Sequence, residues 1–307
     1  MINLLRRWIF SMQASSRSNP VVSIPTSDLD PALLFSSDTV PTSVTTEAST
    51  PPQAPAAPIA ASPEFIEKVK GYHDSNFTHV SSALEHTEKQ LRKSIAKSDA
   101  PGEITFTRLY TMLLGVWCEA RLHKLLYEKG AFSEDERRFV YSANQLSERW
   151  QRALEVGLKK HVGLELDSKI LKTSVTFSVF NIYTEIRGWI SEHFSPAITL
   201  RNKISHGQWV KPFPNTQGEW VNSENFSICQ SSIAALNSEN LLTTTIKIDL
   251  IKEISVTINN LAVDSHVYKT ENFDERHAVV SSIIEKLESA DYRSYKTGIK
   301  GAYKPPA

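Results

Sequence analysis

Beyond residue 63, apolar side chains recur mostly at steps of three and four residues, the spacing that places them on one face of an α-helix. We therefore predict an all-α fold, with helices over residues 65–97, 105–129, 133–161, 168–194, 196–207, 245–267 and 273–292. The first range is either one long helix or a broken one. β-branched and aromatic residues at the start of 168–194 would suit strands, but its length and its lack of turn signals favour a buried helix.

Residues that start and stop helices support these boundaries. Ser62 is a suitable N-cap, and Pro63 suits a first turn because proline lacks an N–H that would have no partner there. Ser133 and Glu136 have the spacing of a capping box, which opens the third helix. This helix carries many charges, which form either a wide solvated face or part of an RNA path.

One segment after residue 207 departs from the helical pattern. Trp209-Val210 and Trp220-Val221 flank residues 212–218, which contain Pro and Gly, as the two arms of a β-hairpin would. We predict a small hairpin here. Its tryptophans either stack on bases, at about 1–3 kcal/mol per base, or plug the hairpin onto the helices.

The first 62 residues differ in composition from the rest. Nine of the 15 prolines lie between Pro20 and Pro63, among Ser, Thr and Ala. Such a segment buries too little apolar area to offset the entropy lost on ordering, so we predict a disordered arm. Residues 1–13, which are basic and apolar, fit an organelle transit peptide, a surface-lying amphipathic anchor, or an unstructured or partner-docking end.

These patterns divide the chain into a disordered arm (1–62), a helical domain (63–292) and a flexible tail (293–307). The hydrophobic content of 40% is enough for a core. No apolar run reaches the length of a membrane span, so a stable span is not expected.

Charge and cysteine content limit the classes of function. Lys plus Arg (34) equals Asp plus Glu (34), so any polyanion site must be a local patch rather than a global positive field. Cys118 and Cys229 are the only cysteines, which argues against a disulfide scaffold and indicates a reducing, cytoplasmic location.

Metal and cofactor motifs are missing. His73, His79 and His86 are six and seven residues apart, and no His-Glu-x-x-His or paired-cysteine spacing occurs. The chain also lacks a Gly-x4-Gly-Lys-Ser/Thr loop, a Gly-x-Gly-x-x-Gly turn and a Gly-x-Ser-x-Gly elbow. We therefore expect neither a metal nor a cofactor.

Polar chemistry is concentrated in residues 196–209. Pro196 suits the start of a helix, and Gly207 suits its end in the left-handed conformation. Asn202 and His206 lie about 40° apart on a helix face, and Arg201 lies about 140° from His206 before its side chain turns. A guanidinium, an amide and an imidazole thus share one helix end.

Arg201, the polar residue Asn202 directly after it, His206 and the following Gly207 resemble the signature of the HEPN superfamily, an arginine followed after four to six residues by a histidine. The resemblance implies a HEPN-like helical bundle that forms a homodimer, with two such motifs facing one cleft. It further implies an endoribonuclease that needs no metal and leaves 2′,3′-cyclic phosphate and 5′-hydroxyl ends. The implied setting is toxin, stress or anti-phage defence, with an antitoxin or regulatory partner.

Residue chemistry suggests a role for each motif side chain. Metal-free RNA cleavage needs a base for the 2′-hydroxyl proton, an acid for the leaving 5′-oxygen and cationic donors for the phosphate. We expect Arg201 to bind the scissile phosphate, His206 to transfer protons and Asn202 to orient the imidazole. Two proton transfers call for two proton-transferring groups, and each motif supplies one histidine. Pairing of two motifs would supply the second.

Four further residues are candidates for RNA contacts: Glu119, Arg121, Lys203 and Trp209. Glu119 and Arg121 stand in an apolar helix, where charges either line a cleft or form a structural ion pair. Arg201 itself has a structural alternative, capping carbonyls or pairing with Glu192. The alternatives in function are a catalytically inactive HEPN module that binds RNA, a nucleotide or a protein, and a scaffold recruited through residues 1–62.

Overall fold

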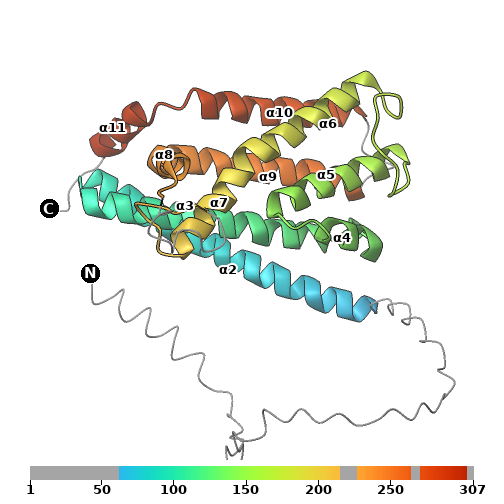
Figure 1. Cartoon of the computed structure of the whole chain (residues 1–307), viewed down its shortest axis with the longest axis horizontal. Coiled ribbons are helices and arrows are strands. Elements are labelled where there is room, and N and C mark those ends of the chain that lie inside the picture. Colours follow the sequence, from blue (N-terminus) through green and yellow to red (C-terminus); the bar gives the residue numbers. More distant parts are fainter. Residues whose placement is uncertain (1–61, 215–226, 264–269, 303–307) are drawn as a thin grey trace, which may run out of the picture. The chain divides into compact units, whose positions relative to one another are not determined.

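The computed structural model describes residues 62–214, 227–263 and 270–302, and within these ranges it contains helices and no β-strand. The all-α prediction is therefore confirmed, and Figure 1 shows how the helices are arranged. The predicted arm before residue 62, the second hairpin arm at Trp220-Val221 and the last five residues lie outside the described ranges.

The first two helices, α2 (Pro63–Ala96) and α3 (Ala100–Leu126), form a helical hairpin. α2 is one continuous helix, and its N-cap Ser62 accepts a hydrogen bond from the N–H of Phe65 at 3.2 Å. The predicted break at 98–102 is shorter than expected, because Asp99 caps α3 through the N–H of Gly102 at 3.0 Å. Proline and glycine there belong to the first turn of a helix.

The third predicted helix is two helices, α4 (Glu134–Tyr141) and α5 (Leu146–Val162). The capping box is present: Ser133 donates its N–H to Glu136 at 2.6 Å, and Glu136 donates its N–H to the Ser133 hydroxyl at 3.3 Å. Two arginines of α5 satisfy carbonyls near the end of α4. Arg149 donates to the carbonyl of Ala143 at 2.9 Å, and Arg152 donates to that of Phe139 at 2.8 Å. Part of the charge on this segment thus stabilises the break.

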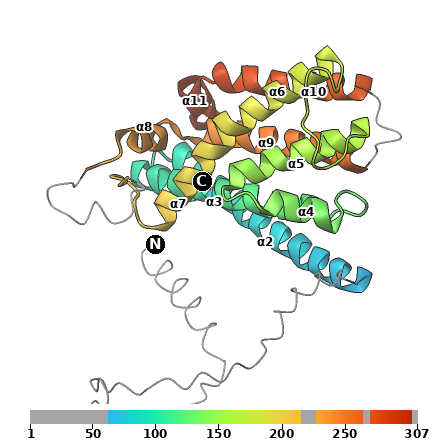
Figure 2. The same ribbon diagram turned by 45° about the vertical axis from the view of Figure 1, so that its right-hand side comes forward.

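The next helices, α6 (Phe177–Trp189), the π-helix η2 (Ile190–Phe194) and α7 (Ser195–Ser205), follow one another without interruption (Figures 1 and 2). α6 begins nine residues later than predicted, after the N-cap Thr176, which accepts from the N–H of Val179 at 3.4 Å. Pro196 was expected to open a separate helix, but it lies in a continuous helical segment. The wider turn of the π-helix accommodates a proline, which lacks an N–H and clashes with the carbonyl four residues before it.

The segment after α7 is irregular up to residue 214. Trp209 and Val210, the first arm of the predicted hairpin, form bends instead of a strand, so the hairpin is not seen in the described residues. The indole Nε1 of Trp209 donates to the carbonyl of Ile204 at 3.0 Å and folds the segment back onto α7. The helix α8 (Gln230–Ser238) follows, in a stretch without a clear hydrophobic pattern.

Three helices complete the fold: α9 (Leu241–Val263), α10 (Thr270–Glu288) and α11 (Tyr292–Ala302). The predicted flexible tail was wrong for residues 293–302, which form α11. Lys296 of α11 donates to both carboxylate oxygens of Glu103 at 2.7 Å, and the Tyr292 hydroxyl donates to one of them at 2.9 Å. These contacts attach the last helix to the start of α3.

One hydrophobic core joins most of these helices, and α3 and α9 lie at its centre. Each of the two buries side chains along its whole length and packs against several other helices. The indole of Trp150 in α5 is fully buried against Phe194 of η2, with ring centroids 5.3 Å apart. Within the described ranges, no helix combines the length and the apolar character of a membrane span.

Candidate functional site

Gly115 determines how closely the motif helix α7 approaches α3. A Cβ atom at this position would lie 2.5 Å from Cβ of Arg201 and 2.9 Å from the carbonyl oxygen of Ala197. Only glycine leaves room for this crossing. Glu119 stands one turn further along the same face of α3, so the close crossing brings Arg201 beside Glu119.

The Arg201 guanidinium is held at two points. Its Nη1 donates to the carboxylate of Glu119, and its Nε donates to the side-chain oxygen of Asn202 at 3.1 Å. The Arg201 side chain is 21% exposed and that of Glu119 is 35% exposed, so the pair lies at the surface of the bundle. Among the described residues, none accepts a hydrogen bond from Nη2 of Arg201. That edge of the guanidinium is free to bind an anion.

This geometry decides between the alternatives for two residues. Arg201 pairs with Glu119 on α3 rather than with Glu192 or with helix-end carbonyls. Asn202 was expected to orient the imidazole, but its side-chain oxygen holds Arg201. Its backbone carbonyl accepts from the N–H of His206 at 3.2 Å. Asn202 therefore fixes the guanidinium and, through the backbone, the end of the helix.

His206 stands at the C-cap of α7 and is exposed. Gly207 follows with φ of +76°, the left-handed conformation expected of it. The N–H of Gly207 bonds to the carbonyl of Ile204 at 3.0 Å, and that of Gln208 bonds to the carbonyl of Lys203 at 2.9 Å. These two bonds form a Schellman motif. It ends the helix directly after His206, and no hydrogen bond of the imidazole occurs within the described ranges.

Lys203 and Trp209 were candidates for RNA contacts, and the structure places both in packing contacts. Lys203 is only 5% exposed, and its ammonium donates to the carbonyl of Phe213. Trp209 packs on the small apolar cluster that contains Leu200 and Ile204. The geometry thus favours packing against the helices over base stacking for Trp209. Lys203 is directed away from solvent.

Arg108, which the sequence pattern did not single out, connects the segment after the motif to α3 and α8. Its Nε donates to the carbonyl of Trp209 at 3.1 Å, and its Nη1 donates to the carbonyl of Leu236. Its Nη2 donates to the side chain of Asn237 at 3.2 Å. Burial lowers the pKa of Arg108, which is only 9% exposed. A cation at the C-terminal end of α8 also complements the dipole of that helix.

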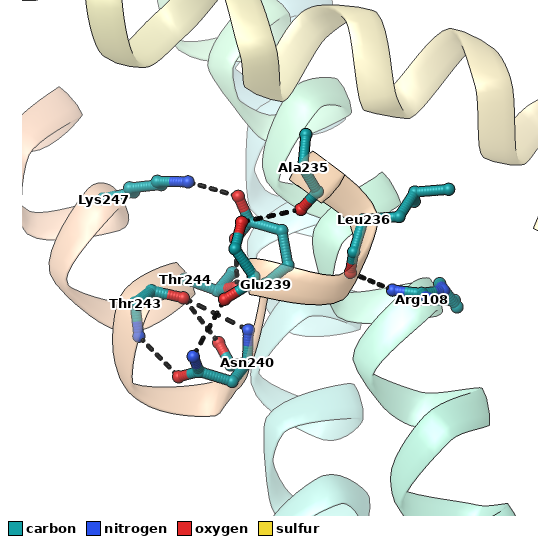
Figure 3. Close-up of polar contacts among 9 residues, drawn as sticks. Arg108, Ala235, Leu236, Glu239, Asn240, Thr243, Thr244 and Lys247 are labelled. Atoms are coloured by element: carbon teal, nitrogen blue, oxygen red, sulfur yellow. Dashed lines mark hydrogen bonds and ion pairs between the residues drawn. The ribbon is translucent and has the colours of Figure 1, made fainter. Parts of the chain in front are cut away.

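The junction of α8 and α9 beside Arg108 is held by a polar network (Figure 3). Asn240 caps α9: its side-chain oxygen accepts from the N–H of Thr243 at 3.0 Å, and its own N–H bonds to the Thr243 hydroxyl at 3.1 Å. The buried Glu239 pairs with Lys247 and accepts from the Thr244 hydroxyl at 3.3 Å. This network fixes the turn between α8 and α9, and Arg108 attaches the end of α8 to α3. α8 in turn packs on α7.

Arg121 is not brought to the motif. Its Nε donates to the hydroxyl of Ser255 in α9 at 2.7 Å, and its guanidinium lies 5.5 Å from the ring centroid of Phe77 in α2. Burial lowers the pKa of Arg121. Two residues along a helix is a rotation of about 200°, so Glu119 and Arg121 face different neighbours. Arg121 is placed between α2 and α9, and Glu119 is placed in the candidate site.

A cluster of rings continues along α3 from Glu119. His123, one turn further on, lies 5.2 Å from the ring centroid of His73 and 5.8 Å from that of Tyr141. Burial is the main cause that lowers the pKa of both histidines. The sequence pattern contains no signal for this cluster, because its members come from three different helices.

Within the described ranges, no three His, Cys, Asp or Glu side chains gather as metal ligands would. Comparisons of the chain with protein-family models, with curated proteins and with solved structures found no match.

Proposed function

We propose that this protein is a metal-independent endoribonuclease of the HEPN type, with Arg201 and His206 as its central residues. One observation carries the proposal. A partly exposed guanidinium, held by Glu119 and Asn202, lies on the same helix end as an exposed imidazole. Nη2 of a guanidinium fixed in this way can donate to an oxygen of a phosphodiester, and an imidazole can act as a general acid or base.

In the proposed reaction, Arg201 binds the scissile phosphate and stabilises the charge that develops on its oxygens. His206 takes part in the proton transfers of the 2′-hydroxyl attack. The products are a 2′,3′-cyclic phosphate and a 5′-hydroxyl. A homodimer in which two motifs face one cleft is part of this proposal, and so is a cytoplasmic setting in toxin, stress or anti-phage defence with an antitoxin or regulatory partner.

The test compares wild type with His206→Ala on total RNA in the presence of EDTA. His86→Ala is the matched control, because His86 is also an exposed histidine on a helix surface, where its Nδ1 contacts the carbonyl of Ser82 at 2.7 Å. We expect wild type and His86→Ala to cut RNA equally and His206→Ala to leave it intact. If wild type leaves the RNA intact, or if His206→Ala cuts it equally well, the nuclease proposal is wrong.

The ion pair also favours a second candidate, an inactive module that binds RNA, a nucleotide or a protein partner. Glu119 compensates the charge of Arg201 in the free protein, as a purely structural pair would. For this candidate, wild type and His206→Ala bind RNA with the same affinity in a filter-binding assay, and neither cuts it.

A further inference from the structure

The further inference concerns Glu119, and it rests on the proposed function. Cleavage by the 2′-hydroxyl needs a base on one side of the phosphorus and an acid on the other, because the attacking and leaving oxygens are roughly in line. Each chain contributes one motif histidine. The side chain that touches the phosphate-binding Arg201 is a carboxylate, the group that acts as a base in many active sites.

We propose that Glu119 is the general base of this reaction and that His206 of the same chain is the general acid. Arg201 contacts Glu119 directly and shares the helix α7 with His206. Its guanidinium bonds to Glu119, and His206 follows five residues later, about 7.5 Å along the axis of α7 and about 140° around it. A phosphodiester bound to Arg201 therefore lies beside the carboxylate, and His206 stands about one and a half turns further along the same helix.

The carboxylate has capacity for this role. An ionised carboxylate accepts about four hydrogen bonds, and the one hydrogen bond that the Glu119 side chain accepts within the described ranges comes from Nη1 of Arg201. The side chain is 35% exposed, so a 2′-hydroxyl has access to it. The α3–α7 crossing at Gly115 fixes its position relative to Arg201.

The step balances without a metal or a further reactant. Glu119 takes the proton of the 2′-hydroxyl, and the 2′-oxygen forms a bond to phosphorus. The bond between phosphorus and the 5′-oxygen breaks, and its electron pair leaves with the 5′-oxygen, which takes a proton from the imidazolium of His206. A 2′,3′-cyclic phosphate and a 5′-hydroxyl result, and exchange of protons with water restores both side chains.

A positioning role for Glu119 predicts different behaviour, and Glu119→Gln separates the two. The amide oxygen of glutamine still accepts from Nη1 of Arg201, but an amide takes no proton at neutral pH. If Glu119 only positions Arg201, most of the activity survives this change. A base makes a contribution of about 100-fold or more, so we expect kcat to fall at least that far.

RNA affinity is the second readout. Removing a negative charge beside the phosphate weakens the repulsion of RNA, so Glu119→Gln is expected to bind RNA as tightly as wild type or more tightly. If Glu119→Gln cleaves RNA more slowly but binds it with undiminished affinity, the loss does not come from a loosened binding site. Glu253→Gln is the matched control, because Glu253 also pairs with an arginine, Arg276, at 3.0 Å, away from the motif. We expect it to match wild type in both measurements.

Glu119→Asp and a mixing experiment complete the design. The aspartate variant keeps a carboxylate, so it is expected to retain more activity than Glu119→Gln. A mixture of Glu119→Gln with His206→Ala stays inactive if base and acid act in one chain. Activity restored by mixing would place them in different subunits and overturn the single-chain assignment.

The two proposals fail in different ways. If wild type cleaves RNA and Glu119→Gln cleaves it equally fast, Glu119 is not the base, whereas the nuclease assignment stands. If Glu119→Asp and Glu119→Gln lose activity equally while both keep the unfolding midpoint of wild type in urea, the carboxylate is not what the reaction needs, and the inference is also wrong. If wild type does not cleave RNA at all, both proposals are wrong.

Discussion

Gly115→Ala tests whether the close crossing of α3 and α7 positions Arg201. The added methyl group would lie 2.5 Å from Cβ of Arg201, whereas ordinary contacts between such atoms begin at 3.4 Å. The carbonyl oxygen of Ala197, at 2.9 Å, belongs to the backbone and has no rotamer to change. The helices must therefore separate by about 1 Å, close to the shortfall in the Cβ contact.

Two opposing contributions determine the free energy of unfolding of this variant. Replacing glycine by alanine inside a helix stabilises it by about 0.5–1 kcal/mol. Overpacking a filled contact typically destabilises by about 1–3 kcal/mol. Gly71→Ala isolates the first contribution, because a Cβ at Gly71 of α2 meets no atom within 4 Å. The difference between the two variants is then the packing cost alone.

Urea unfolding of both variants measures that difference, and cleavage of RNA measures its consequence for the site. We expect Gly115→Ala to be less stable than Gly71→Ala by about 1–3 kcal/mol. A displacement of about 1 Å at a phosphate-binding group is also expected to lower the cleavage rate by up to about 100-fold. If Gly115→Ala is as stable as Gly71→Ala, the close crossing does not constrain α7.

Two further predictions concern the surroundings of the site. Arg108→Met leaves two carbonyls without their donor and should lower the free energy of unfolding, measured in urea, by about 2–4 kcal/mol. Arg138→Met, at an exposed arginine, should change it by less than about 1 kcal/mol. Equal effects of the two substitutions would contradict the structural role of Arg108. Burial lowers the pKa of His123 below its ordinary value near 6.5, so its contribution to stability is present above about pH 6.5 and is lost as the pH falls through the folded pKa. The urea midpoint of wild type should therefore be lower at pH 5 than at pH 7.5, and this drop should be smaller in His123→Gln. An equal drop in the two proteins would show that His123 is not the cause of the pH dependence.

Hydrophobic spacing predicted the helices because it reports a local property, the face that each helix buries. It found the ranges of α2, α3, α7, α9 and α10. Helix boundaries were predicted wrongly where a residue type is common both at the end of one helix and at the start of the next. The predicted ranges 65–97 and 105–129 leave Asp99 and Pro101 between two helices, but these residues belong to the start of α3. Pro196 suggested a helix start, but the preceding π-helix keeps the chain helical through it.

Contacts between distant residues escaped prediction for a different reason. Arg201 and Glu119 are 82 positions apart. No local pattern in either segment indicates that Gly115 allows α3 and α7 to touch. The pattern identified both residues, but it offered Arg121 as the structural partner of Glu119 and Glu192 as that of Arg201. Arg108 was missed because one arginine in an apolar helix carries no sign of the three groups that it binds.

The two cations of α7 show how burial, rather than charge, decides which of them is accessible to a ligand. Arg201 and Lys203 are two positions apart, so their side chains point about 160° apart around the helix. Lys203 is 5% exposed and donates to the carbonyl of Phe213, whereas the Arg201 side chain is 21% exposed and keeps one edge without a partner in the described residues. Lys203 thus holds the irregular segment that follows His206, and Arg201 is the cation that a phosphate can reach. The face of α7 that carries Leu200 and Ile204 fixes this division, because burying those two residues sets the rotation of the helix for both cations.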